Sequence, residues 1–285
     1  VAVLSGFVRH WRKAVHAPKS WGGHLRQAVR GLALSGLARG GAWSSEPFLR
    51  CLYCHYVFDD QEAMFRSQLE MLLGAGRFVD TATLLAMRAG EVPITGPTFH
   101  LSFDDGFLNH RSNAARILKE LEIPALFFVP TGFVGADLET SRRYAVEIAD
   151  YQAPIEMMTW DDVGELVALG FDVGSHTRHH ARLSRLNDDA ALRDEIAGSK
   201  GDLEARLGRP CPTISWPFGT LDDISGRALE IVQEAGYEAC FGAYRGTVRP
   251  GQTDIMRIPR HHFEVQWPVS HVRYFAQGHR EHADA

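Results

Sequence analysis

The chain has 285 residues, of which 45% are hydrophobic and 23% are charged, a composition typical of a soluble globular protein with a sizeable core. The length fits one large domain or two small ones, and no apolar run approaches the roughly 20 residues that span a bilayer. The net charge of −5 argues against a nucleic-acid-binding protein, because no basic-aromatic binding motif offsets it.

Positive charge is concentrated at the N-terminus. Residues 1–45 contain seven Lys and Arg residues and no acidic residue, which leaves 23 basic and 35 acidic side chains in the remainder, a net charge of −12. We therefore divide the chain into a basic N-terminal extension, 1–45, and a main domain, 46–285. We expect the extension to be solvated and to pack on the acidic domain; the alternative is contact with an anionic glycan or with membrane headgroups.

The first predicted strand, 48–58, carries two of the four cysteines, Cys51 and Cys54. Their CxxC spacing occurs in zinc and redox sites, but there is no second CxxC, and residues three apart on a strand point to opposite faces. We expect all four thiols to be reduced and structural. Such thiols and the absence of a signal-peptide pattern favour a cytoplasmic location; removal of a leader would indicate a periplasmic or secreted one.

Strand-like and helix-like segments alternate along most of the chain. Residues 131–157 are irregular and predict a long loop with one helical stretch near 141–150. The other predicted elements are, in chain order, a helix at 61–75, a strand at 98–103, a helix at 110–121, a strand at 124–130, a helix at 160–169, a strand at 171–175, a helix at 187–208, a strand at 213–216, a helix at 224–235 and strands at 237–241 and 256–259. This alternation predicts an α/β fold with parallel strands, whose carboxyl ends meet on one face.

Two polar motifs follow predicted strands. Asp104 and Asp105 end the strand at 98–103, where adjacent carboxylates repel each other unless a cation is present. His176 and His180 follow the strand at 171–175; imidazoles at i and i+4 are neighbours that can share one metal ion, with His179 as the competing candidate. One Asp, two His and a spare Asp for proton transfer are the minimum equipment of a metal-assisted hydrolase.

The chain resembles the polysaccharide deacetylases of carbohydrate esterase family 4. The resemblance runs from about Leu49 to Arg260 and includes three ordered motifs: Phe103-Asp-Asp-Gly106, His176-Thr-Arg-His-His180 and Ser215-Trp-Pro-Phe-Gly219. It implies a distorted (β/α) barrel with fewer than eight regular units, and it makes residues 46–285 a deacetylase-like catalytic domain.

The resemblance also implies roles for the residues that match these motifs. Asp104 would be the general base, and the backbone N–H of Phe218 would form the oxyanion hole. The metal ligands would be Asp105, His176 and His180, and the metal would be zinc, with cobalt or another divalent ion as alternatives. For Trp216, core packing is the main interpretation and contact with a sugar ring the alternative; Pro217 is a further candidate for substrate binding.

The sequence departs from the family pattern at two points. Many members have an Arg at the position of Ser215, where it holds the base; we hypothesise that Arg260 replaces it from a neighbouring strand. The late Leu-x-His motif that commonly supplies the general acid is also missing. His261 and His262 are nearby in sequence, but spacing assigns neither, which leaves a loop histidine or Asp104 itself as candidates.

The main functional hypothesis is metal-dependent removal of N-acetyl groups from amino sugars in a surface polysaccharide, glycolipid or precursor. One alternative is a deformylase or other C–N hydrolase of the same fold. Another is a catalytically inactive carbohydrate-binding relative, favoured by the missing Arg and late His but opposed by the intact motifs of Asp and His. The sequence does not determine the oligomeric state.

Overall fold

Parallel strands form the centre of the computed structural model, which describes residues 6–16, 43 and 46–281. In chain order they are β1 (Phe48–Cys54), β2 (Arg77–Phe78), β3 (Pro97–Phe103), β4 (Leu126–Val129), β5 (Asp172–Ser175), β6 (Thr213–Ser215), β7 (Ala239–Phe241) and β8 (Arg260–His262). Their order in the sheet is β7-β6-β5-β4-β3-β1-β8, with β2 added against β3. Every pairing between these strands is parallel, as the alternating sequence pattern predicts.

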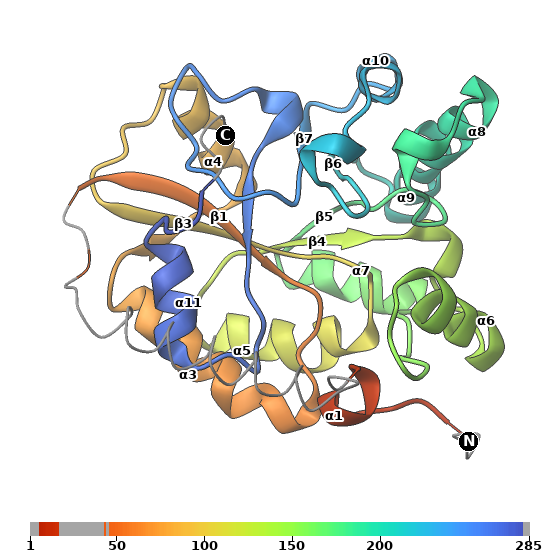
Figure 1. Ribbon diagram of the computed structural model, residues 1–285, viewed down its shortest axis with the longest axis horizontal. Helices are drawn as coiled ribbons and strands as arrows, with labels where there is room; N and C mark the ends of the chain where they lie inside the picture. Colours follow the sequence, from red (N-terminus) through yellow and green to blue (C-terminus); the bar gives the residue numbers. More distant parts are fainter. Residues whose placement is uncertain (1–5, 17–42, 44–45, 282–285) are drawn as a thin grey trace, which may run out of the picture.

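The sheet curls into a nearly closed barrel. On one side β8 pairs with β1, with Arg260 opposite Cys51. On the other side Ile258, just before β8, forms a parallel bridge with Phe241 of β7, and its N–H donates to the Cys240 carbonyl at 2.9 Å. Within the described residues, seven strands thus follow one another around the barrel, which confirms the expected distorted barrel with fewer than eight regular units (Figure 1).

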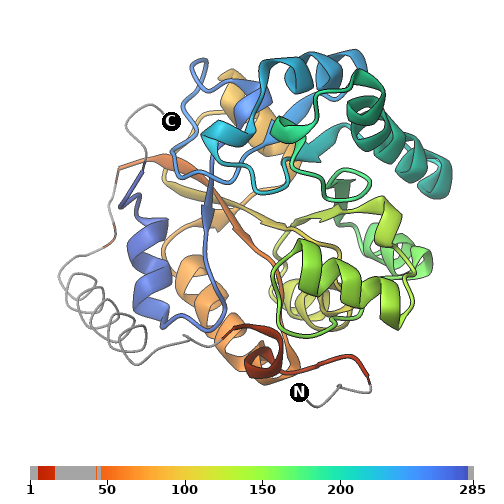
Figure 2. The same ribbon diagram turned by 45° about the vertical axis from the view of Figure 1, so that its right-hand side comes forward.

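Helices surround the barrel, as the two views of the ribbon show (Figures 1 and 2). They are α1 (Trp11–Ala14), α3 (Glu62–Leu73), α4 (Thr81–Ala89), α5 (Ala115–Glu120), α6 (Leu138–Arg142), α7 (Trp160–Ala168), α8 (Asp189–Arg193), α9 (Ser199–Leu207), α10 (Gly226–Glu234) and α11 (Val269–Ala276). A π-helical turn at His110–Ala114 continues into α5, so the two together form the helix predicted at 110–121. A second π-helical turn at Asp194–Gly198 joins α8 to α9, and these form the helix predicted at 187–208. None of the helices in the described part of the chain is long and apolar enough to cross a membrane.

The strands are apolar on both faces because both faces are covered. Every residue of β1 is buried, and its side chains alternate between two clusters. Cys51 packs inside the barrel with Leu126 and Phe128, whereas Cys54 packs with the outer helices. All four cysteines are buried and unpaired, as expected; for Cys51 and Cys54 the expectation came from the strand periodicity.

Several elements differ from the sequence prediction. The predicted strand at 256–259 is wrong: Asp254 caps a 3₁₀ turn at Ile255–Arg257, and Pro259 has no N–H for a ladder, so the strand begins only at Arg260. The β2–α4 unit was not predicted, since β2 has only two residues. The helix α11 was also missed.

Most of the basic extension predicted at 1–45 lies outside the described residues. In its described segment, 6–16, Val8 and Ala14 are buried against the loop that carries Tyr144 and Tyr151. The Val8 N–H donates to the Pro154 carbonyl at 3.0 Å. This part of the segment therefore packs against the domain; the division at residue 45 stays a prediction.

Candidate active site

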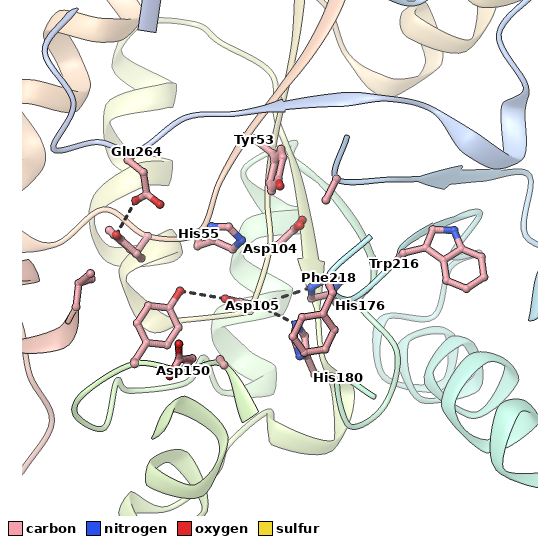
Figure 3. Close-up of a pocket in the computed structure, with 15 residues that line it drawn as sticks. Tyr53, His55, Asp104, Asp105, Asp150, His176, His180, Trp216, Phe218 and Glu264 are labelled. Atoms are coloured by element: carbon pink, nitrogen blue, oxygen red, sulfur yellow. Dashed lines mark hydrogen bonds and ion pairs between the residues drawn. The ribbon is translucent and has the colours of Figure 1, made fainter. Parts of the chain in front are cut away.

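The predicted site residues meet at the carboxyl ends of the strands. Asp104 and Asp105 follow β3, His176 follows β5, and Phe218 lies three residues beyond β6. They border one cavity of about 260 Å³ (Figure 3). Other residues that line this cavity are Tyr53, His55, Tyr151, His180 and Glu264.

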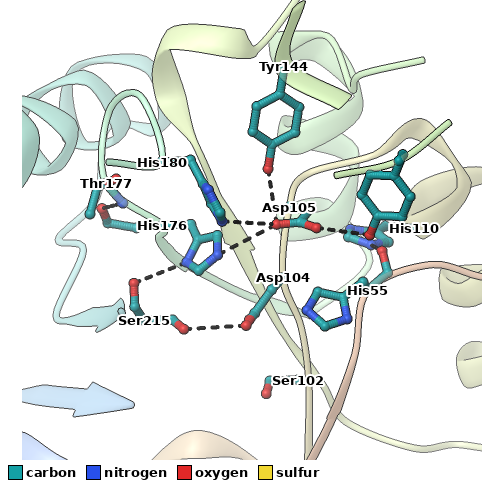
Figure 4. A network of polar contacts seen from close by, with 12 residues as sticks. His55, Ser102, Asp104, Asp105, His110, Tyr144, His176, Thr177, His180 and Ser215 are labelled. Carbon is teal, nitrogen blue, oxygen red and sulfur yellow. Dashed lines mark hydrogen bonds and ion pairs between the residues drawn. The ribbon is translucent and has the colours of Figure 1, made fainter. Parts of the chain in front are cut away.

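Asp105, His176 and His180 lie together as the metal-ligand prediction requires. The Asp105 Oδ1 atom is 3.6 Å from His176 Nε2 and 3.4 Å from His180 Nε2, and all three side chains are buried (Figure 4). Ligand atoms about 2.0–2.1 Å from a tetrahedral zinc ion are separated by about 3.4 Å, so these residues fit a divalent metal.

Neighbouring groups orient these three side chains. Tyr144 donates to Asp105 Oδ1 at 3.0 Å, and Tyr151 donates to Oδ2 at 3.2 Å. His176 Nδ1 lies 3.0 Å from the Ser215 carbonyl, so this nitrogen carries the proton and leaves Nε2 as the lone-pair donor. Such outer contacts are what fix the ligands of protein metal sites.

Burial sets the charge of this group. It lowers the pKa of His176 to about 4, which keeps the imidazole neutral at physiological pH. Burial by itself would raise the pKa of Asp105, but the nearby imidazoles of His180 and His55 lower it below its usual range. The site thus offers one carboxylate and the neutral ring of His176 as ligands.

Strained backbone accompanies the motif residues. Four non-glycine residues adopt positive φ at this site: Asp105 (80°), Thr177 (61°), His180 (56°) and Phe218 (65°). Side-chain-bearing residues rarely adopt this region, and such conformations cluster where function requires them. The adjacent Gly106 is required by its surroundings, because a Cβ there would lie 2.9 Å from Pro130 Cδ and its φ is +69°.

Arg260 contacts Asp104 as hypothesised. Its two terminal nitrogens each donate to one carboxylate oxygen of Asp104 at 2.8 Å, and both side chains are buried. The same guanidinium also donates to the Ser215 hydroxyl at 2.6 Å and to the Ser102 hydroxyl at 3.1 Å. Burial would raise the pKa of Asp104, but the Arg260 charge lowers it below its usual range, so Asp104 stays ionised.

The third motif contributes one exposed side chain and two buried ones. Phe218 is 38% exposed at the cavity, and the Arg182 guanidinium stacks on its ring 3.8 Å from the ring centre. Trp216 borders the cavity, but it is only 2% exposed and its ring packs with Ile214 and Leu183. Pro217 is buried as well, so neither predicted substrate contact offers a free side-chain face to a sugar.

The three histidines that the sequence offered as alternative ligands or acids lie outside the Asp105, His176 and His180 group. His179 turns away from the ligand group, and its Nδ1 lies 2.8 Å from Glu195 Oε1. His261 is buried with its Nε2 atom 3.2 Å from the Gly246 carbonyl. His262 approaches the cavity region, with Nε2 3.1 Å from Glu264 Oε1.

Sequence reasoning missed His55, Tyr144, Tyr151 and Glu264. His55 follows β1 directly and lines the cavity. The rule that identified Asp104 would have identified His55, but the apolar run predicted a strand through residue 58 and placed His55 inside it. The tyrosines come from the irregular 131–157 region, where no pattern in the sequence points to the cavity.

Comparisons with known proteins agree with this geometry. The model of the polysaccharide deacetylase family matches residues 92–240, which contain Asp104, Asp105, His176, His180 and Phe218. The chain is 25% identical over 168 residues to the poly-beta-1,6-N-acetyl-D-glucosamine N-deacetylase of Staphylococcus aureus, a match covering 56% of this chain and 52% of that protein. The chain therefore belongs to the polysaccharide deacetylase family, and it spans about half the length of the curated relatives it matches.

Two solved structures extend the likeness. The structure of IcaB from Ammonifex degensii has a TM-score of 0.66 and 25% identity, covering 82% of this chain and 98% of that one. The BpsB deacetylase domain from Bordetella bronchiseptica has a TM-score of 0.64 and 18% identity, covering 77% of this chain and 97% of that one. The distorted barrel is thus the fold of known deacetylase domains.

Proposed function

We propose that this protein is a metal-dependent hydrolase that removes N-acetyl groups from amino sugars of a surface polysaccharide or its precursor. One observation carries the proposal: a buried Asp-His-His group that fits a divalent metal lies beside Asp104, a second carboxylate held ionised by Arg260. Family membership and the names of the relatives support an N-acetylated glycan as the substrate. We propose zinc as the metal, with cobalt as the alternative.

Each residue of the site has a place in amide hydrolysis. Asp105, His176 and His180 would hold the ion, which supplies activation of water and polarisation of the acetyl carbonyl. Asp104 is held apart from these ligands by Arg260, so its carboxylate can accept the proton of the attacking water. The backbone N–H of Phe218 would donate to the oxyanion that develops on the carbonyl.

His55 is our candidate for the proton donor to the departing amine. It lines the same cavity and stands near both aspartates, on the side opposite the metal-ligand histidines in Figure 3. Burial lowers the pKa of His55, so the resting ring is neutral; once it has received a proton released from the attacking water, it would pass that proton readily to the amine. His55, just after β1, would then be the general acid that the Leu-x-His motif, missing here, commonly supplies.

The proposal is tested by measuring acetate and formate release from matched N-acetylated and N-formylated glucosamine oligomers, in β-1,6 and β-1,4 linkage. We expect acetate release from one acetylated series, a loss of at least 100-fold in Asp104→Asn, and unchanged release in the exposed-surface control Glu230→Gln. Preferential release of formate would favour the deformylase alternative. Binding of the oligomers without release of either acid would favour the inactive relative.

A further inference from the structure

A second group of possible metal ligands lies beside the proposed active site. His55, His262 and Glu264 each offer one ligand atom, and these atoms all lie within 4.8 Å of one another. The group joins the end of β1 to the last residue of β8 and the segment after it, and both His55 and Glu264 line the cavity. Neither His262 nor Glu264 has a role in the mechanism proposed above.

The Glu264 carboxylate is positioned with one oxygen directed at the histidines. Its Oε2 atom accepts hydrogen bonds from the Tyr56 hydroxyl at 2.6 Å and from Gln266 Nε2 at 3.1 Å. Its Oε1 atom lies 3.1 Å from His262 Nε2. A carboxylate held by one oxygen while the other faces imidazoles is the arrangement of a supported metal ligand.

The histidine nitrogens are also placed for coordination. His262 Nε2 is buried and, among the described residues, has no partner in hydrogen-bond geometry, although Glu264 Oε1 is close. The His55 and His262 rings lie edge to face with centres 5.0 Å apart, and Tyr53 packs against both. The 3.1 Å separation of nitrogen and oxygen is close to the roughly 3.4 Å between ligands of a tetrahedral zinc ion.

The donor set suits a divalent cation. Two imidazoles and one carboxylate, with ligand atoms within 4.8 Å of one another, are groups that zinc or cobalt takes as ligands in proteins.

We propose that His55, His262 and Glu264 form a second, inhibitory divalent-metal site next to the catalytic one. An ion bound there takes the His55 lone pair that would otherwise carry the proton for the leaving amine. Loading of this site therefore stops turnover, while loading of Asp105, His176 and His180 enables it. The inhibitory effect, though not the binding, rests on the proposed deacetylase function.

Counting bound ions tests the site independently of catalysis. The probe is Co²⁺, with its content per chain measured after equilibrium dialysis and its visible spectrum recorded. We expect two ions per chain in the unmodified protein, one in Asp105→Ala, one in Glu264→Gln and none in the double variant. The control Asp194→Asn changes an exposed residue of another group of possible ligands, His179, Asp194 and Glu195, and is expected to keep two ions.

A single ion in the unmodified protein at saturation would overturn the proposal in favour of a metal-free contact between His262 and Glu264. Two ions in Glu264→Gln would also overturn it, because the second ion would then be bound by other residues. Thermal unfolding followed by circular dichroism shows whether each variant is folded, and His262→Gln replaces Glu264→Gln if the latter is not. The effect on turnover is measured by adding excess Zn²⁺ to the reconstituted enzyme. We expect at least tenfold inhibition of the unmodified protein and less than twofold inhibition of Glu264→Gln.

The two proposals fail in different ways. Two ions bound at saturation, together with no acid release when only one equivalent of metal is present, would refute the deacetylase function and leave the second site intact. Acid release that excess Zn²⁺ does not inhibit, with one bound ion, would refute the second site and leave the deacetylase function intact.

Discussion

At the scale of single residues, Arg260 supplies the positive charge beside Asp104 that the motif around Ser215 lacks. The Arg260 guanidinium, from β8, donates two hydrogen bonds of 2.8 Å to the Asp104 carboxylate. The uncharged Ser215 hydroxyl accepts a third hydrogen bond from the same guanidinium at 2.6 Å. The charge and the fork geometry therefore come from a different strand than in many relatives. Because both partners are buried, neither can be removed without leaving the other uncompensated.

Removing this guanidinium should reduce turnover. We expect Arg260→Ala to lose about 3–5 kcal/mol of stability by leaving a buried carboxylate unpaired. In Arg260→Lys, which keeps the charge but loses the fork, we expect kcat/KM to fall about 100-fold because Asp104 is no longer held in place. Steady-state kinetics on variants shown to be folded measure the effect.

A rescue experiment separates positioning from general damage. Adding Ser215→Arg to Arg260→Ala moves the guanidinium to the position it has in many relatives, and partial recovery of kcat/KM is expected. Unchanged turnover in Arg260→Ala would show that Arg260 has no part in positioning the base.

The two tyrosines that donate to Asp105 should tune metal affinity. We expect Tyr144→Phe to weaken Co²⁺ or Zn²⁺ binding about 10–100-fold, because the carboxylate loses the 3.0 Å bond that orients it. Competition with a chromophoric chelator measures the affinity. Tyr237→Phe removes an equally buried hydroxyl bonded to the Ile196 carbonyl and is the matched control; equal affinities in the two variants would contradict the account.

At the scale of the element, β5 positions His176, and the strand contains a site, Gly174, where only glycine fits without a shift of its neighbours. Gly174 faces Phe128 of β4, and a Cβ there would lie 2.5 Å from Thr213 Oγ1 and 2.7 Å from Phe128 Cε1. Three neighbouring strands therefore approach each other closely just before the metal ligand. The packing of β5 against β4 and β6 is thus coupled to the geometry of the site.

We expect Gly174→Ala to lower the free energy of unfolding by about 1–3 kcal/mol and to weaken metal binding, because β5 must shift. Gly164 in α7 has open space around its Cβ position, so Gly164→Ala should instead add about 0.5–1 kcal/mol. Urea unfolding curves measure both changes. Equal free energies of unfolding for the two variants would show that β5 accommodates the added methyl group without strain.

The site residues that follow strand ends could be predicted from the sequence, whereas the contacts that depend on closure of the barrel could not. Asp104, Asp105 and His176 follow apolar runs with clear ends, so their meeting could be inferred from parallel topology. Arg260 and Asp104 are 156 residues apart in the chain, and their contact depends on the pairing of β8 with β1, which no local pattern encodes. The boundary of β1, misplaced by four residues, was enough to hide His55.

At the scale of the whole molecule, the end of the described chain is tied to the barrel by charge. Glu281 contacts the Arg50 guanidinium of β1 at 2.8 Å and the Thr247 hydroxyl at 2.7 Å, and it lies 3.3 Å from His261 of β8. Burial would raise the pKa of Glu281, but His261, Arg50 and Thr247 lower it to about 2. This contact joins the two strands at which the chain begins and ends the barrel.

The depressed pKa makes this contribution pH-dependent. A carboxylate whose folded pKa is about 2 stabilises the fold fully above its unfolded value near 4.5, and the stabilisation is lost as the pH falls toward 2. Because Glu281 is partly exposed, screening limits the effect to about 1–2 kcal/mol. Unfolding free energies between pH 6 and pH 2 should fall less steeply in Glu281→Gln; parallel curves would show that the contact is not linked to stability.

The dependence of activity on a bound divalent ion is the most direct test of the central claim. Acetate release from N-acetylated glucosamine oligomers is measured on protein dialysed against a chelator and then again after one equivalent of Zn²⁺ or Co²⁺ is added. We expect loss of acetate release on dialysis, recovery with one equivalent of the ion, and no recovery in Asp105→Ala or His176→Ala. Release that persists after the metal has been removed to below one-hundredth of an equivalent per chain would contradict it.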